Sequence, residues 1–260
     1  MKIEKSDYQT PEGERIAKRM ARAGLCSRRE AEKWIEEGRI KVNGKKITSP
    51  ALNVTESDAI TVDGKLMAQQ EPTRLWLYHK PQGLVTTHND PEGRKTVFEA
   101  LPKNLPRVIS VGRLDLNSEG LLLLTNDGAL ARKLELPSTG WIRRYRVRCY
   151  GGITESMLTG MKEGVKIDGV QYGSVDTKLD SQTGNNNWLT VALSEGKNRE
   201  IRKIFEYYGC KVSRLIRTSY GPFQLGALPK SEIKEVTGKV LRSFVKLEGA
   251  GDGGQGSGKP

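Results

Sequence analysis

Histidine and cysteine are scarce in this 260-residue sequence, and their scarcity excludes several kinds of protein. The three cysteines, Cys26, Cys149 and Cys210, lie far apart and are odd in number, so they imply no disulfide framework and favour a reducing cytosol. The two histidines, His79 and His88, have no CxxC pair beside them, which argues against a zinc deaminase or a zinc hydrolase. The sequence also lacks a P-loop, and without a GxSxG elbow a serine-histidine triad is disfavoured.

Long apolar runs are missing as well. Residues 1–15 lack the apolar core of a signal peptide. No stretch of the chain approaches the ~20 apolar residues that a membrane-spanning helix needs. We therefore expect a cytoplasmic protein that does not interact with membranes.

Acidic residues are outnumbered by basic ones. The chain has 43 Lys and Arg against 31 Asp and Glu, a formal net charge of +12. This excess makes a polyanionic partner the first hypothesis, with an ordinary soluble basic protein as the alternative that composition leaves open. The position of the charge along the chain has to decide between the two.

The N-terminal part of the sequence predicts a compact module of two helices and a hairpin. Residues 14–25 carry apolar side chains at helical spacing. Ser27 and Glu30 have the spacing of a capping box, which starts a second helix at once. Asn43-Gly44, between short apolar stretches, is typical of a tight β-hairpin.

This module holds much of the excess charge. Residues 15–46 contain eleven basic and four acidic side chains, a net charge of +7. Aromatic residues are few here, so recognition of RNA backbone and shape suits the module better than stacking on unpaired bases. The alternative is an ordinary solvated face. The side chains predicted to bind RNA are Arg15, Lys18, Arg19, Arg22, Ser27, Arg28, Arg29, Lys41 and Lys45.

A polar stretch from about Gly64 to Arg74 is interpreted as a linker to a second unit. In that unit short apolar runs at 75–77, 84–86, 108–111, 121–124 and 189–193 alternate with turn signals at Asp127-Gly128 and Asp168-Gly169. Helical patterns occur at 129–134, 155–161 and 199–208. The expected class is α+β with a mixed or antiparallel sheet and flanking helices. The predicted organisation is a flexible N-terminus (1–12), an RNA-binding domain (13–70), a catalytic domain (71–247) and a disordered Gly-rich tail (248–260).

The strongest chemical signal is a charged loop between two apolar runs, within Val111 to Gly128. It reads Gly-Arg-Leu-Asp from Gly112 to Asp115, followed by Ser118-Glu119-Gly120 and four leucines. Such a loop can hold a polar group rigidly at the edge of a cleft. On general grounds alone, a turn-forming or salt-bridged Asp115 would be the favoured interpretation.

Several motifs carry a resemblance that overturns that interpretation. The Asp115 run resembles the catalytic motif of pseudouridine synthases, in particular the RsuA and RluB branch. Residues 16–44 resemble the small RNA-binding module named after the fourth protein of the small ribosomal subunit. Lys80-Pro81-Gln82-Gly83 is similar to the first motif of the catalytic domain, and residues 195–202 and 220–223 are similar to its late motifs.

The resemblance implies that Asp115 is the nucleophile that attacks the target nucleoside, so that the uracil detaches, turns and rejoins its ribose through carbon. It implies no cofactor, metal or nucleotide. An ionised nucleophile requires a nearby cation, and Arg202 matches the basic residue of the family that pairs with the aspartate. Tyr145 matches the tyrosine on which the flipped base stacks and which handles protons. Ile201, Arg113 and Lys80 are expected in the substrate pocket.

The surroundings of Tyr145 leave an alternative open. Arg144, Arg146 and Arg148 alternate with less polar residues, so a strand would place the arginines and the tyrosine on opposite faces. Without the resemblance, Tyr145 is better interpreted as a core residue. The arginines are equally compatible with a phosphate-binding stripe and with a solvated face.

The sequence therefore predicts a monomeric enzyme that isomerises a uridine of ribosomal RNA, with 23S RNA favoured over 16S RNA. Pre-ribosomal particles are a further expected partner. Two alternatives stay open: the same reaction on 16S RNA, and an RNA-binding ribosome assembly factor without catalysis.

Overall fold

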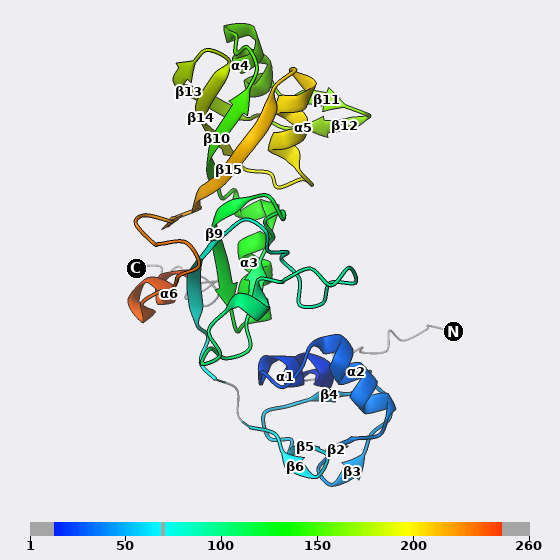
Figure 1. Ribbon diagram of the computed structural model, residues 1–260. Coiled ribbons are helices and arrows are strands. Elements are labelled where there is room, and N and C mark those ends of the chain that lie inside the picture. The colour runs from blue at the N-terminus through cyan, green and yellow to red at the C-terminus, as the bar shows by residue number, and fades with distance from the viewer. Residues whose placement is uncertain (1–12, 69–70, 246–260) are drawn as a thin grey trace, which may run out of the picture. The chain divides into compact units, whose positions relative to one another are not determined.

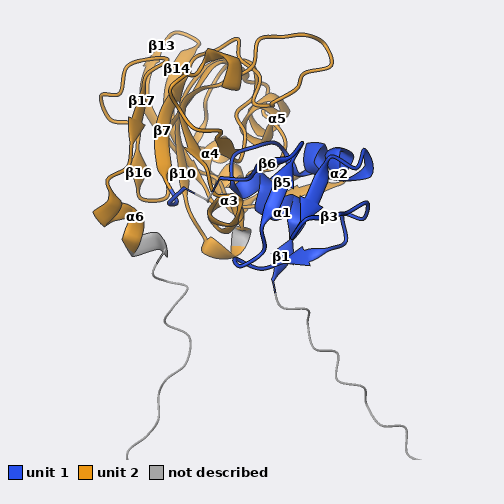
Figure 2. Cartoon of the chain, turned by 90° about the horizontal axis from the view of Figure 1, so that it is seen from below, with its two compact units in different colours: residues 1–73 blue, residues 74–260 orange. Residues whose placement is uncertain are grey.

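A computed structural model of the protein describes residues 13–68 and 71–245. The chain divides into two compact units, residues 1–73 and 74–260, which Figure 2 shows in different colours. The predicted flexible N-terminus and Gly-rich tail lie outside the described residues. In the part of the chain that the structure describes, every helix is too short or too polar to cross a membrane.

Unit 1 packs two short helices against small strands. The predicted capping box is present: the Ser27 hydroxyl accepts from the Glu30 amide at 3.2 Å, and the Glu30 carboxylate accepts from the Ser27 amide at 2.6 Å. Ile16, Met20 and Ile35 are fully buried in its core. The elements are β1 (Glu14–Arg15), α1 (Ile16–Arg22), α2 (Arg28–Glu36), β2 (Ile40–Val42), β3 (Lys45–Lys46), β4 (Asn53–Val54), β5 (Ile60–Val62) and β6 (Lys65–Leu66).

Two hairpins form the four-stranded sheet of unit 1, whereas β1 and β4 pair with each other. Asn43 and Gly44, with φ of 50° and 80°, make the predicted turn between β2 and β3. Asp63 and Gly64 make a second turn of the same kind between β5 and β6. The prediction of a linker from Gly64 was therefore wrong at its start, because Asp63-Gly64 is itself a hairpin signal.

Unit 2 is built on one large sheet with the strand order β13-β14-β10-β15-β9-β7-β17 (Figure 1). The β15–β9 pair is parallel and its other neighbouring pairs are antiparallel, so the predicted α+β class with a mixed sheet is confirmed. Its strands are β7 (Leu75–Lys80), β8 (Ile109–Val111), β9 (Glu119–Thr125), β10 (Arg143–Tyr150), β11 (Val165–Ile167), β12 (Val170–Tyr172), β13 (Asp176–Thr183), β14 (Asn186–Leu193), β15 (Lys211–Tyr220), β16 (Phe223–Gln224) and β17 (Ile233–Glu235). Its helices are α3 (Gly128–Glu135), α4 (Glu155–Glu163), α5 (Glu200–Tyr207) and α6 (Gly238–Val245), with 3-10 turns η1 (Phe98–Ala100) and η2 (Pro137–Thr139).

Two local predictions in unit 2 were wrong. The apolar run 84–86 forms only an isolated bridge between Val85 and Thr96 and not a strand. Asp127-Gly128 is not a turn, because the Asp127 carboxylate accepts from the amides of Ala129 and Leu130 and caps the start of α3. Aspartate followed by glycine suits both a turn and a helix start, and the helical periodicity that follows decides between them.

Strand β10 has the predicted alternation. Arg144, Arg146 and Arg148 are exposed, whereas Tyr145 and the two residues that follow at alternate positions are buried. The sheet therefore presents Tyr145 to the side that α5 covers and the arginines to the opposite face.

The two halves of the large sheet meet at a narrow junction. Strands β15 and β9 are paired at only two positions, Ile216 with Glu119 and Arg217 with Gly120. Gly120 has a φ of 106°, and an added Cβ would come too close to the backbone oxygen of Arg217. Only glycine allows the backbones to approach this closely.

We predict that Gly120→Ala lowers the free energy of unfolding by about 3 kcal/mol or more, because neither backbone can move aside. Urea denaturation measures the effect. The matched control is Gly184→Ala, which has a φ of 56° and open space around its Cβ position, so it should cost only about 1–2 kcal/mol. Equal losses in the two variants would show that the close approach at Gly120 is unimportant.

Candidate active site

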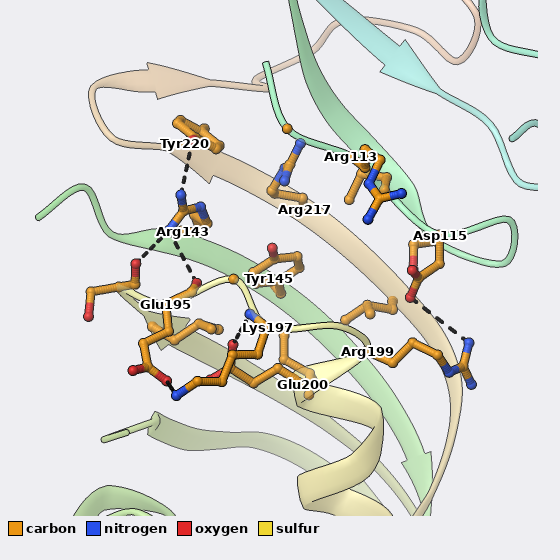
Figure 3. Close-up of a pocket in the computed structure, with 18 of the residues that line it drawn as sticks. Arg113, Asp115, Arg143, Tyr145, Glu195, Lys197, Arg199, Glu200, Arg217 and Tyr220 are labelled. Carbon is orange, nitrogen blue, oxygen red and sulfur yellow. Dashed lines mark hydrogen bonds and ion pairs between the residues drawn. The ribbon is translucent and has the colours of Figure 1, made fainter. Parts of the chain in front are cut away.

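A cavity of about 480 Å³ opens in unit 2 between the Asp115 loop, strands β10 and β15, and the start of α5 (Figure 3). Asp115 and Tyr145, predicted to be catalytic, and Ile201 and Arg113, predicted to contact the substrate, all line this cavity. A second, more polar cavity of about 420 Å³ adjoins it and shares Arg113 and Asp115 with it. The described residues that line these cavities do not include Lys80, which the sequence had placed in the pocket.

Lys80 instead holds the backbone of the Asp115 loop from beneath. Its side chain is completely buried, and its ammonium group donates to the carbonyls of Pro81, Asp115 and Ser118 at 3.0, 3.1 and 2.8 Å. Burial lowers the pKa of Lys80 to about 8, although the nearby carboxylates of Asp115 and Glu119 act in the opposite direction. The prediction of a substrate contact was wrong. Whether Lys80 is exposed or buried depends on tertiary packing, which the motif by itself does not specify.

Arg202 also binds the backbone of the Asp115 loop, at Asn117. Its guanidinium donates to the carbonyl of Asn117 at 2.8 Å and to that of Val212 at 3.0 Å, so it ties the Asp115 loop to the start of β15. Burial lowers the pKa of Arg202, helped by neighbouring Arg199, while Asp115 raises it. Arg202 is thus within electrostatic range of Asp115 without being bonded to it.

The expected ion pair of Asp115 is made by a different residue. Among the described residues, the carboxylate of Asp115 pairs with Arg199, with a nitrogen-to-oxygen distance of 3.9 Å (Figure 3). Arg199 precedes α5 and has a left-handed φ of 51°. Both side chains are substantially exposed, so this pair is worth at most about 1 kcal/mol. The predicted pairing with Arg202 fails because the Arg202 fork is occupied by two carbonyls.

Tyr145 combines the two roles that the sequence left open. It is 8% exposed and belongs to the apolar core, yet it also lines the cavity from β10. Its neighbours across the sheet are Val191 on β14 and Arg217 on β15. Ile201, in the first turn of α5, is 5% exposed and adds an apolar wall. An aromatic ring beside aliphatic walls is suited to hold a planar base.

Sequence reasoning missed Glu200, another residue of the cavity wall. It is 4% exposed, and its carboxylate accepts from the Lys197 amide at 2.9 Å. Burial raises the pKa of Glu200 to about 7. The hydrogen bond from Lys197 lowers the pKa of neighbouring Glu195. Glu200 lies within the motif from Glu195 to Arg202, which could have pointed to it, but a motif does not show which of its side chains are buried.

The basic residues of unit 1 are not equally available to RNA. Lys18, Arg19 and Arg22 gather around Glu14 at 3.4, 3.8 and 2.9 Å, so one acid partly neutralises three of the predicted contacts. The Ser27 hydroxyl serves the helix cap. The predicted residues that remain exposed are Arg15, Arg28, Arg29, Lys41 and Lys45.

Comparison with known families identifies the class of protein to which this fold and pocket belong. Residues 74–207 match the model of the RNA pseudouridylate synthase family, and residues 14–60 match that of the S4 domain. The chain belongs to the RNA pseudouridine synthase family, so it binds RNA and isomerises uridine to pseudouridine.

Relatives and solved structures agree with this assignment. The chain is 54% identical to an uncharacterized RNA pseudouridine synthase of Rickettsia felis, over 88% of this chain and 99% of the relative. It is 44% identical to ribosomal large subunit pseudouridine synthase B of Pasteurella multocida, over 86% of this chain and 67% of the relative. A crystal structure of a pseudouridylate synthase superimposes with a TM-score of 0.62 at 25% identity, covering 89% of this chain and all of that one.

We predict that Arg202→Lys lowers kcat/KM for pseudouridine formation about 100-fold, because lysine cannot span the two carbonyls and the Asp115 loop shifts. Arg199→Lys keeps a cation near an exposed carboxylate and should cost less than about fivefold. Initial rates at subsaturating RNA measure both. A larger loss for Arg199→Lys would mean that the direct ion pair, and not the loop backbone, governs the nucleophile.

We also predict that activity falls as the pH rises through about 8, because Lys80 then loses its proton and has two N–H donors left for three carbonyls. The pH profile of kcat/KM tests this. Lys80→Arg keeps a permanent cation, so in a folded variant the alkaline decline should move to higher pH. A wild-type profile that stays flat to about pH 9.5 would contradict the prediction.

Proposed function

We propose that this protein converts a uridine of ribosomal RNA, and specifically of large-subunit 23S RNA, to pseudouridine with Asp115 as the nucleophile. The observation that carries the proposal is the position of the Asp115 carboxylate. It is part-exposed and faces a cavity that also contains Tyr145, while the backbone of its loop is held by buried Lys80 at Asp115 and by half-buried Arg202 at Asn117. A fixed and accessible carboxylate is what nucleophilic catalysis requires.

The proposed reaction balances without a co-reactant. The bond between N1 of uracil and C1′ of ribose breaks while the Asp115 carboxylate engages the nucleoside. The base then turns in the cavity, and C5 of uracil joins C1′. A proton leaves C5 and N1 gains one, so substrate and product have the same composition.

The cavity suits the step in which the base must turn. Tyr145 offers an aromatic face, and Ile201 and the other apolar wall residues offer contacts that do not depend on the orientation of the ring. Stacking and apolar contact help to offset the few kcal/mol lost when the uridine leaves its helix. Because apolar contacts are not directional, they allow the uracil to turn within the cavity.

The choice of large-subunit RNA is supported by the named large-subunit synthase of Pasteurella multocida. The exposed cations of unit 1 support a grip on a structured stem. We propose that the protein acts in the cytoplasm as a monomer, on free RNA or pre-ribosomal particles. The same chemistry on 16S RNA and a role in assembly without catalysis are the competing outcomes.

We predict that Asp115→Asn lowers the rate of pseudouridine formation about 10⁴-fold without changing RNA affinity, since the amide cannot act as the nucleophile. Mapping of pseudouridine in 23S and 16S transcripts, with the exposed Asp168→Asn as control, measures this. Product found only in 16S RNA would refute the substrate choice. Tight binding by the wild type without any product would favour the assembly factor, and full activity of Asp115→Asn would refute the nucleophile.

A further inference from the structure

Arg217 is a buried cation that pairs with no carboxylate of the described residues. It lies in the middle of β15 and is 3% exposed, yet it lines the cavity. One of its nitrogens donates to the carbonyl of Leu121 at 2.7 Å, and a terminal nitrogen is buried with no hydrogen-bond partner. Among the described residues no ion pair includes Arg217. A buried charge without a counter-ion is costly, so its presence beside a cavity points to an anion that arrives from outside.

A second guanidinium increases the positive charge at this wall. The central carbons of Arg143 and Arg217 lie 4.7 and 5.2 Å from the centre of the same ring, that of buried Tyr220. Arg143 also donates to the Tyr220 hydroxyl and to the carbonyls of Ser194 and Glu195, so three of its N–H groups are already used and its guanidinium is held in place. Arg143 therefore adds positive charge from a fixed position, and Arg217 adds charge together with a buried terminal nitrogen that has no hydrogen-bond partner.

The carboxylates of the cavity are engaged elsewhere. Asp115 pairs with Arg199, Glu195 pairs with Lys197, and Glu200 accepts from the Lys197 amide. Glu135, the remaining acid of the wall, accepts from the Gly112 amide at 2.6 Å. None of these bonds is directed to Arg217, so its charge is left for the ligand.

The position of Arg217 relates it to the bound base. Arg217 is the cross-strand neighbour of Tyr145, and in Figure 3 its side chain lies between Arg113 and Arg143 on the wall above the tyrosine. A uridine that stacks on Tyr145 necessarily brings along the phosphodiesters on its 5′ and 3′ sides. The planar guanidinium fork matches phosphate oxygens in geometry and charge.

We propose that Arg217, with Arg143 and Arg113 beside it, forms a subsite for a phosphodiester that flanks the flipped uridine. This subsite rests on the proposed function, and it anchors the backbone of the target nucleotide while its base is free to turn. A purely structural role is the alternative, because the bond to Leu121 ties β15 to β9. That bond requires one N–H group, and it leaves a second, buried nitrogen without a hydrogen-bond partner and the charge without a carboxylate partner among the described residues.

The test combines a protein variant with an RNA analogue that lacks the phosphate charge. A short target stem-loop is made with a neutral methylphosphonate either 5′ or 3′ of the target uridine. For the wild type, one of the two replacements should lower kcat/KM about 30-fold, and its position identifies the phosphate. Arg217→Gln should lower kcat/KM on ordinary RNA by a similar factor. The same replacement should then cost this variant less than about threefold, because the partner is already gone.

Arg132→Gln is the matched control, since it removes an exposed arginine of α3 that does not line either cavity and should behave as the wild type. Wild-type rates that are unaffected by both replacements would overturn the subsite while leaving the proposed function intact. Losses from variant and analogue that simply multiply would assign Arg217 a structural role. If Arg217→Gln does not fold, the wild-type comparison and Arg217→Lys decide instead. Absence of product on ordinary RNA would instead refute the proposed function.

Discussion

The arrangement of the site depends on one buried ammonium group and the three carbonyls that it holds. Lys80 is completely enclosed, and its donors reach both ends of the turn that carries Asp115. Because no carboxylate takes up its charge in these bonds, the lysine must be satisfied by main-chain oxygens in one particular arrangement of the loop. A small displacement of that loop would leave both a buried charge and several carbonyls unpaired.

The cations of the site differ in what they bind: two hold the backbone of the loop and one approaches the carboxylate of Asp115. Lys80 and Arg202 bind backbone atoms and leave the side chain of Asp115 unencumbered, whereas Arg199 approaches its carboxylate loosely and from the solvent side. A strong direct ion pair would have competed with the nucleoside for the same oxygen atoms. Because the bonds are made to the backbone and not to the carboxylate, the Asp115 side chain is fixed in place and its oxygens can still reach the nucleoside.

The sequence predicts well the features that depend on neighbours along the chain. The capping box at Ser27, the turn at Asn43 and the alternation around Tyr145 follow from local spacing, and all are present. The bonds from Lys80 and Arg202 to the Asp115 loop were not predictable, since these partners lie 35 to 85 residues away and depend on how packed elements converge. The resemblance placed Asp115, Tyr145 and Ile201 around one cavity, but it could not assign contacts to the arginines.

The junction at Gly120 divides the catalytic unit into two bodies. The loop with Asp115 belongs to the half-sheet of β7, β8 and β9, whereas Tyr145 belongs to the half-sheet of β10, β13, β14 and β15. Only two residue pairs join these halves along β9 and β15. Asp115 and Tyr145 therefore stand on different halves of the sheet, and the space between nucleophile and aromatic ring is set by how closely β9 and β15 approach at Gly120.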